Sequence, residues 1–293
     1  AGLVASSFAF VNLFARPLWC DVDPATGMLD PARIAALVTP RTRAILAYHW
    51  SGDVADLEAL QSAARSNGLA LIEDASEAFG AEYRGRKLGN HGSDFCVYSF
   101  AAVRQITTGE GAALFCSSAL HHAQARQLRR YGIHQASFRL SSGDLNPESD
   151  IAVPGFNFCM NNVAATIGLA QFPQVEDIVS RQRANGRHFD GALAGTAGIT
   201  LLARREDAVS GYWTYSLRAE RRADLMRKLQ QEGIGCQRLH VRNDGYSCFA
   251  HLRREHALPG VDRFDRENLS IPCGWWLTIE ERERIVACIR AGW

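Results

Sequence analysis

Polar residues follow three predicted strands, at places where α/β proteins often carry out chemistry. Asp74 ends the apolar run LALIEDAS (69–76), Ser99 ends DFCVYSF (94–100), and the turn T-T-G-E-G spans 107–111. In open α/β sheets, ligands bind beyond the carboxyl ends of the strands. From its position alone, Asp74 could hold a cationic ring nitrogen, bind a metal or cap the next helix. Ser99 and the glycine-rich turn could cradle a phosphate through backbone N–H groups, or they could form an ordinary turn.

The elements that position these residues are predicted from periodicity and capping signals. The run 42–50 has strand character, and 56–68 places apolar residues on one helical face before Gly68 ends the helix. Together with the strand at 69–76, these segments form a βαβ unit, which implies parallel strands. Further strands are expected at 94–100 and 111–116, and helices at 31–37, after Ser118, at 161–172 with Asn161 as its cap, and from Pro173 to Leu193.

The C-terminal third has a different pattern of elements. It predicts a strand at 212–220, a helix at 223–233, a strand at 234–240 and a last helix after Thr278, with Glu281 completing a capping box. We therefore expect an α/β protein with a mostly parallel sheet in a large domain (1–194) and a small α+β domain (195–293). The first sixteen residues favour a strand-and-turn region.

Composition excludes several classes of protein. The chain has 293 residues, of which 47% are hydrophobic, and a formal net charge of +1. Nucleic acid and anionic membranes attract a basic excess, so neither is expected as a partner. No apolar run reaches the length of a membrane span. Its eight cysteines contain no C-x-x-C pair and no histidine cluster has zinc-like spacing, so we expect no metal site and a reduced, cytoplasmic setting.

Lysine is almost absent from the chain. Only Lys87 and Lys228 occur among its 32 basic residues, and the others are arginines. Chemistry that needs a primary amine on a side chain therefore has two candidates. Both fall in polar segments, Lys87 in a turn and Lys228 on a helix, so surface charges are expected.

Five segments read together resemble a known family, the DegT/DnrJ/StrS sugar aminotransferases. These proteins have the fold-type-I architecture of transferases that depend on pyridoxal phosphate (PLP), and they act on nucleotide-linked keto sugars. The segments that carry the resemblance cover nearly the whole chain: DVDPATGMLDPARIAALVTPRTRAI (21–45), LIEDASEAFGAEYRGRKLG (71–89), YSFAAVRQITTGEGAAL (98–114), GFNFCMNNVAATIGLAQF (155–172) and LSIPCGWWLTIEERERIVACIRAGW (269–293).

The resemblance implies roles for four residues. Asp74 matches the carboxylate that pairs with the pyridine nitrogen of PLP, where an anion keeps the ring protonated and electron-withdrawing. Glu77 stands where the family usually has Gln or His against the ring, and Ser99 matches a phosphate-binding serine. Asn157 matches an asparagine that reaches the cofactor phosphate of the neighbouring subunit in the family homodimer. From the residues alone, Asn157 could instead cap the helix near 161, and Ser99 could simply end its strand.

The chain departs from the family pattern at the residue that matters most. In the family a lysine follows Ser-Phe and three variable residues, and it forms the aldimine with PLP and shuttles a proton. Here that residue is Arg104. A guanidinium stays protonated, so it neither condenses with an aldehyde nor acts as a base. Ala112 replaces a family glycine and Cys159 a family Arg or His, while Glu77 adds an anion to the site.

A further departure concerns the start of the chain. The family carries several dozen residues before the point where this sequence begins, including a helix and a Gly-Thr turn that grips the PLP phosphate. We therefore expect an N-terminally truncated large domain, whether because the sequence is partial or because the polypeptide is shortened.

These observations lead to an expected function with two alternatives. The resemblance implies a PLP-dependent aminotransferase that acts on nucleotide-linked keto sugars and takes its amino group from a donor such as glutamate. Because of Arg104, we expect the enzyme to be impaired or inactive and to hold the cofactor without a covalent bond. One alternative is a non-catalytic dimerisation partner of an active paralogue. The other is a sugar dehydratase that uses pyridoxamine phosphate (PMP), although its relatives carry His at the lysine position.

The substrate is less well defined by the sequence. The segment 239–249 and the IPCGWW segment resemble the subgroup in surface-polysaccharide and LPS sugar pathways. Within the first of these, His240 and Asn243, together with Arg242 and Asp244, could contact sugar hydroxyls or could form a polar loop.

Overall fold

A computed structural model describes residues 2–252 and 256–293. Its central sheet has four strands in the order β1-β2-β5-β6, formed by Ala44–Tyr48, Ala70–Asp74, Phe95–Ser99 and Ala112–Cys116. The pairs β1–β2 and β2–β5 are parallel, and β6 runs antiparallel to β5. The predicted α/β class with a mostly parallel sheet is therefore confirmed.

Helix α2 (Leu57–Ser66) forms the crossover between β1 and β2. The Asp56 side chain accepts the N–H of Ala59 at 3.1 Å and caps its N-terminus, while Gly68 adopts φ +63° just after its end. Residues with a side chain rarely adopt that backbone conformation, which explains the glycine. Leu57, Leu60 and Ala64 are the buried face of the helix. The predicted βαβ unit is thus present, and its helix begins and ends next to the capping residues, Asp56 and Gly68, from which it was predicted.

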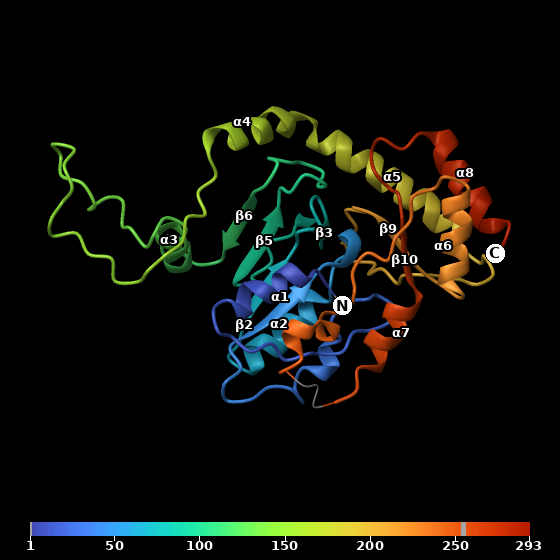
Figure 1. Cartoon of the computed structure of the whole chain (residues 1–293), viewed down its shortest axis with the longest axis horizontal. Helices are drawn as coiled ribbons and strands as arrows, with labels where there is room; N and C mark the ends of the chain where they lie inside the picture. The colour runs from blue at the N-terminus through green and yellow to red at the C-terminus, as the bar shows by residue number, and fades with distance from the viewer. Residues whose placement is uncertain (1, 253–255) are drawn as a thin grey trace.

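A second, antiparallel sheet lies in the C-terminal part, in the order β10-β9-β7 (Asn268–Ile271, Tyr215–Ala219, Ile199–Leu201). Helices α5 (Val175–Leu193), α6 (Arg222–Gln231) and α8 (Ile279–Arg290) lie beside it in Figure 1. Their apolar faces share one core, which includes Phe189, Leu217, Leu225 and Ile289. The capping box predicted at Thr278 and Glu281 is present at the start of α8.

A third, small sheet joins distant parts of the chain in the order β4-β3-β8 (Arg86–Lys87, Glu82–Tyr83, Ala208–Val209). It pairs residues on both sides of the predicted boundary at 194–195. The remaining helices are α3 (Ala119–Leu128), α4 (Asn162–Gln171) and α7 (Pro259–Glu267), with 3-10 turns at Pro31–Arg33, Trp50–Gly52, Phe172–Gln174, Asn243–Gly245 and Ser247–Phe249.

Three expectations about secondary structure are wrong. The helix predicted at 31–37 is only a 3-10 turn at Pro31–Arg33. The chain opens with helix α1 (Val4–Val11) rather than a strand-and-turn region. Long-range contacts explain α1, because Phe8 stacks on Phe249 with ring centroids 5.5 Å apart. Residues 234–240 form no strand, since only Gln237 pairs with Ser270 through an isolated bridge. Ile234 and Cys236 in this segment pack against the core of the second sheet, but the segment forms no continuous ladder of backbone hydrogen bonds with it.

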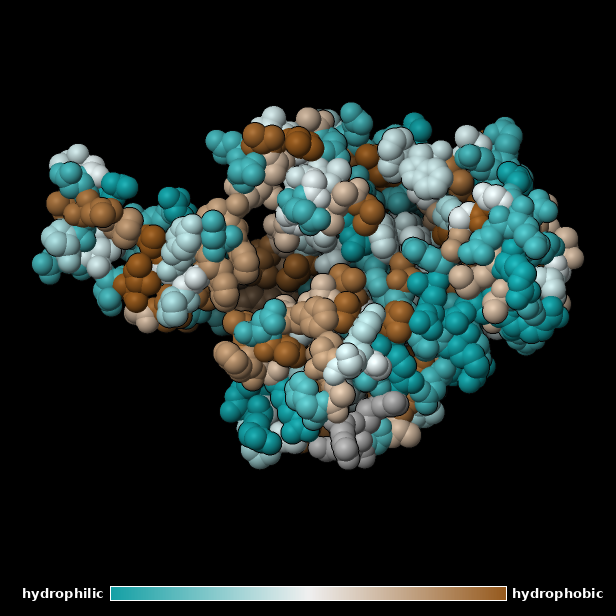
Figure 2. All heavy atoms as spheres, viewed as in Figure 1, coloured by the Kyte–Doolittle hydropathy of each residue, from teal (hydrophilic) through white to brown (hydrophobic). Residues whose placement is uncertain are grey.

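The segment between α3 and α4 leaves the body of the molecule in Figure 1. We call residues 129–161 the arm. Figure 2 shows apolar surface on the arm and over α4. Among the described residues, no helix combines the length and apolar character needed to cross a lipid bilayer.

Candidate active site

Asp74 closes β2 at the carboxyl edge of the central sheet. Its Oδ1 accepts the N–H of Ser76 at 3.0 Å, and its Oδ2 accepts the hydroxyl of Ser6 from α1. Tyr48 ends β1 directly opposite Asp74 in the parallel register. The strand edge that sequence reasoning singled out therefore brings a carboxylate and a phenol side by side.

Glu77 lies three residues further on and is completely buried. Its Oε2 accepts the N–H of Ser51 at 2.9 Å, and its Oε1 lies 2.8 Å from Nε2 of His240. The same imidazole nitrogen lies 3.0 Å from the Tyr48 hydroxyl. Burial raises the pKa of Tyr48 well above its ordinary value, and the negative charges of Glu77 and Asp74 raise it further. Tyr48 is consequently a neutral hydrogen-bonding group at physiological pH.

Arg104 stands in the turn after β5 and points into the same cluster. Its Nη1 lies 3.8 Å from Oε1 of Glu77, and its Cζ lies 4.1 Å from the centroid of the Trp213 ring. The indole N–H of Trp213 donates to the carbonyl of Val103 at 2.8 Å, which fixes the ring against the same turn. The Arg104 side chain is 6% exposed, and within the described structure its Nε and Nη1 have no hydrogen-bond partner.

The glycine-rich turn after Arg104 is anchored from another element. Gln171 of α4 accepts the N–H of Thr107 at 3.2 Å and donates to its carbonyl at 2.7 Å. Ser99 ends β5, and its Oγ accepts the N–H of Ala101 at 3.2 Å. Ser99 therefore stabilises the turn that carries Arg104. This placement is compatible with both roles expected for Ser99, a phosphate contact or the end of a strand.

The two predicted substrate residues differ in placement. His240 joins the cluster through Glu77 and Tyr48. Asn243 lies against α1, where its Nδ2 donates to Ser7 Oγ at 3.1 Å and its buried Oδ1 has no partner among the described residues. Only His240 is therefore brought into direct contact with the predicted cofactor residues.

Asn157 lies outside the cluster in this chain. It is exposed on the arm, where its backbone pairs with Arg130. The cap of α4 is Asn161, whose Oδ1 accepts the N–H of Ala164 at 2.8 Å, so Asn157 is not the helix cap. Its predicted role toward a neighbouring subunit stays a prediction.

Sequence reasoning missed four residues of the cluster: Ser6, Tyr48, Ser51 and Trp213. The rule that placed Asp74 at a strand end could also have found Tyr48, because β1 ends in register with β2. Ser51 follows directly in the same connection. Trp213 and Ser6 carry no local signal, since each reaches the site from a segment far away in the sequence.

The two lysines occupy surface positions, as expected. Lys87 on β4 donates to Glu82 at 2.9 Å, and Lys228 on α6 donates to the carbonyl of Gly292. Within the described part of the chain, neither lysine has a contact with Asp74 or Arg104. Among the described residues, neither lysine therefore brings a side-chain amine to the cluster.

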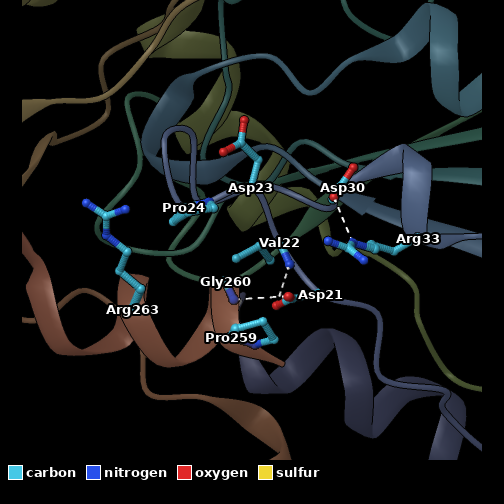
Figure 3. Close-up of a pocket in the computed structure, with 9 residues that line it drawn as sticks. All are labelled: Asp21, Val22, Asp23, Pro24, Asp30, Arg33, Pro259, Gly260 and Arg263. Atoms are coloured by element: carbon cyan, nitrogen blue, oxygen red, sulfur yellow. Dashed lines mark hydrogen bonds and ion pairs between the residues drawn. The ribbon is translucent and has the colours of Figure 1, made fainter. Parts of the chain in front are cut away.

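A hollow of about 420 Å³ lies elsewhere, between the 21–33 segment and the start of α7 (Figure 3). Its buried carboxylate, Asp21, accepts the N–H groups of Gly260 and Val261 at 3.0 and 2.8 Å. These bonds satisfy the open N–H groups of α7. Asp21 thus stabilises a helix end, and this hollow does not compete with the Asp74 cluster as a catalytic site.

The cluster fits a PLP-type cofactor in one respect and fails to fit it in another. A buried carboxylate at Asp74 suits a protonated ring nitrogen, and the unpaired donors of Arg104 suit an oxyanion of the ligand. The residue at 104, however, offers no amine for a covalent bond. The residues present are therefore suited to non-covalent binding alone. The described residues contain no group of three His, Cys, Asp or Glu side chains able to hold a metal.

Residues 1–290 match the DegT/DnrJ/EryC1/StrS aminotransferase family. The chain belongs to this family. The resemblance found in the sequence and the expected transferase architecture are both confirmed, and the family is one of aminotransferases.

Similar solved structures agree with this assignment. The sugar aminotransferase CalS13 from Micromonospora echinospora is 35% identical with a TM-score of 0.94, over 99% of this chain and 78% of that one. AtS13 from Actinomadura melliaura is 37% identical with a TM-score of 0.92 and the same coverage. DesV from S. venezuelae, solved with a ketimine intermediate, is 28% identical with a TM-score of 0.89, over 99% and 75% of the two chains.

Proposed function

We propose that this chain binds a PLP-type cofactor without a covalent bond and is impaired or inactive as a sugar aminotransferase. The observation that carries the proposal is Arg104, buried in the cluster at the position of the family lysine. A guanidinium has neither the nucleophilic amine nor the basic lone pair that transamination requires. The fold and the remaining polar groups support binding, while the residue at 104 argues against turnover.

Each group of the cluster has a defined task in this proposal. When bound, the cofactor would supply an electron-withdrawing ring. Asp74 would hold the protonated ring nitrogen, with its carboxylate kept in place by the hydroxyl of Ser6 and the N–H of Ser76. Arg104 would pair with an anionic oxygen of the ligand. We keep Ser99 as a candidate phosphate contact, and His240 and Asn243 as candidate sugar contacts.

The family supports a proposal for the class of substrate. The neighbours CalS13 and AtS13 are more than 30% identical to this chain, and CalS13 is a sugar aminotransferase. We propose a nucleotide-linked keto sugar as the ligand and an amino acid such as glutamate as the donor in the ancestral reaction. The subgroup resemblance in 239–249 supports a cytoplasmic pathway to surface polysaccharide or LPS sugars.

The division into domains at 194–195 stays a prediction.

A cofactor-binding experiment tests this function. The purified chain is titrated with PLP while the absorbance of the cofactor and the fluorescence of tryptophan are followed, and a sample is treated with borohydride before mass spectrometry. We expect saturable binding and no borohydride-fixed adduct. Binding should change the tryptophan fluorescence, because Trp213 lies beside Arg104. A pyridoxyl group found on Lys87 or Lys228, or the absence of saturable binding, would contradict the proposal.

A second candidate, the non-catalytic partner, is favoured by the apolar face of the arm and α4. Large apolar side chains exposed there include Phe156, Phe158, Val163, Ile167, Leu169 and Phe172. A contiguous exposed apolar face on a folded protein marks an interaction surface. We propose that a second copy or a homologous subunit covers it, so that the chain forms a homodimer or pairs with an active paralogue, with Asn157 at the interface.

A further inference from the structure

Two loops each contribute one residue to the candidate active site. The loop 50–53 follows β1, and the N–H of its Ser51 donates to Oε2 of Glu77 at 2.9 Å. The loop 211–214 precedes β9 and carries Trp213, the ring that packs on the guanidinium of the site. Because the loops lie far apart in the sequence, their spacing has to be set by tertiary contacts.

The two loops lie against each other along their backbones. Ser51 Oγ donates to the carbonyl of Thr214 at 2.8 Å, and the N–H of Gly211 donates to the carbonyl of Gly52 at 2.9 Å. Gly52 adopts φ +105°, and a Cβ on it would lie 2.6 Å from the backbone nitrogen of Tyr212. A side chain at that position would push the loops apart, which explains the glycine. A shift of either loop is therefore passed to the other.

Arg204 joins the two loops. Its Nε donates to Oδ1 of Asp53 in the loop 50–53 at 2.9 Å, and its Nη1 donates to Oδ1 of Asp190 on α5. Oδ2 of Asp190 accepts the hydroxyl of Tyr212, which belongs to the other loop, at 2.6 Å. The guanidinium Cζ also lies 4.7 Å from the centroid of the Tyr212 ring. One side chain thus holds the first loop directly and the second loop through an aspartate and an aromatic ring.

An arginine suits this place for two reasons. The side chains of Asp53 and Asp190 are 5% and 29% exposed, so their negative charges need a cation between them. A guanidinium presents its N–H donors in several directions of one rigid plane and can bind both carboxylates at once, whereas an ammonium is a point charge on a flexible chain. The spacing of the two loops therefore depends on the geometry of one largely buried side chain.

We propose that Arg204 is a positioning residue of the candidate cofactor site, and that it sets the places of Ser51 and Trp213 without touching the ligand. When the guanidinium is lost, the charges of Asp53 and Asp190 repel each other and the loops can separate. The inference rests on the proposed function, because the loops border the proposed cofactor site. It deepens that function by naming a residue on which the geometry of the site depends.

The test compares Arg204→Met with Arg205→Met, both in the full chain, by titration with PLP. Arg205 is the matched control, because this neighbouring arginine also binds two carboxylates, Asp56 at 2.8 Å and Asp207 at 2.9 Å, but neither belongs to the two loops. We expect Arg204→Met to raise the Kd for PLP at least about tenfold, the lower end of what outer residues that orient metal ligands contribute. Arg205→Met should stay within about twofold of the unmodified chain, since partly exposed ion pairs contribute little.

A second readout follows Trp213 itself and needs no cofactor. Acrylamide quenching of tryptophan emission is recorded for each variant and for the same variant carrying Trp213→Phe, and the difference reports the exposure of this ring. We expect the Trp213 emission to be quenched more strongly in Arg204→Met than in Arg205→Met. An effect on global stability alone would leave this difference unchanged in the folded protein, and thermal unfolding verifies that each variant is folded.

A milder pair of variants tests the inference if Arg204→Met does not fold. Tyr212 and Tyr215 both donate a hydroxyl to Asp190, at 2.6 and 2.8 Å, but Tyr212 lies in the loop 211–214 and Tyr215 lies on β9. Tyr212→Phe should raise both the Kd for PLP and the quenching of Trp213. Tyr215→Phe should raise neither by as much.

The outcomes separate this inference from the proposed function. Equal Kd values for Arg204→Met and Arg205→Met, or unchanged Trp213 quenching in Arg204→Met, would overturn the positioning role. Equal effects of the two tyrosine variants would overturn it as well. If the unmodified chain does not bind PLP, the proposed function fails, and the quenching of Trp213 still decides whether Arg204 positions the loops.

Discussion

The guanidinium of Arg104 lies over the indole of Trp213, with Cζ 4.1 Å from the ring centroid. This contact joins the turn after β5 to the loop before β9. Trp213 is fixed in turn by its N–H bond to Val103, the residue just before Arg104. The arginine is therefore held from its face by an aromatic ring and from its edge by Glu77, which gives it one orientation in a buried site.

A double-mutant cycle measures the energy of this contact. Arg104→Met and Trp213→Leu remove the charge and the ring, separately and together, and urea unfolding gives the free energy of each variant. Cation–π pairs contribute about 0.5–1 kcal/mol at exposed sites and about 2 when desolvated, so we expect a coupling of about 1–2 kcal/mol here. Additivity of the two single effects would show that the stacking has no energetic role.

Glu77→Gln in the otherwise unchanged chain should destabilise the protein. The variant keeps an acceptor for the N–H of Ser51 but leaves the buried cation of Arg104 without its nearest carboxylate. Breaking a buried ion pair by removing one partner costs about 3–5 kcal/mol in well-formed pairs, and the 3.8 Å separation here places our expectation near the lower end, about 3 kcal/mol. Urea unfolding at neutral pH measures the loss.

The second change in the same pair supplies the control. Adding Arg104→Met to Glu77→Gln removes the unpaired cation and should recover most of the lost stability. A double variant that is less stable than Glu77→Gln would contradict this expectation, because it would mean that losing the contact of Arg104 with Trp213 costs more than leaving the cation without a carboxylate.

The parts of the fold that were predicted from sequence depend on local signals. Asp56 and Gly68 delimit α2, and Thr278 with Glu281 starts α8, because capping requires only neighbouring residues and their backbone. Asp74 was placed at a strand end by the periodicity of its own segment. These features could be read without knowing what packs against them.

The parts that were missed depend on distant contacts. Helix α1 is supported by Phe8 on Phe249 and by the bond of Ser6 to Asp74, and nothing within its own residues announces either partner. Trp213 reaches Arg104 from another part of the chain. Glu77 and Arg104 lie on different segments of the chain, so the contact between them needed the folded structure.

A second buried carboxylate, Glu73, should make the protein sensitive to acid. Nδ1 of His49 accepts the N–H of Ala55 at 3.1 Å, so Nε2 carries the hydrogen that is donated to Glu73. Burial acts to raise the pKa of Glu73, but the hydrogen bond from His49 outweighs it and holds the pKa below the ordinary value of 4.5. The folded state therefore binds fewer protons at this group than the unfolded state as the pH falls past 4.5.

It follows that Glu73 contributes stability above pH 4.5 and loses that contribution on further acidification. We expect wild type to be more stable than Glu73→Gln at neutral pH, and the difference between them to shrink as the pH falls below that value. Urea unfolding of both proteins across this range measures it. A difference that stays constant or widens toward low pH would show that the sign of the linkage is wrong.

The proposed contact with a second subunit predicts an effect of charge on the arm. Phe156 and Phe158 stack on each other with centroids 4.8 Å apart, and Phe158 is 70% exposed. Burying such a ring at an interface contributes about 1.5–3 kcal/mol, and a carboxylate in its place would have to be desolvated. Phe158→Asp should therefore weaken self-association by at least about tenfold, as measured by sedimentation equilibrium. Phe14→Asp is the matched control, because Phe14 is 99% exposed in the turn after α1 and belongs neither to the arm nor to α4, so the change should leave the association unchanged. If the unmodified chain is monomeric at every concentration, or if both variants associate equally, the arm does not join two copies.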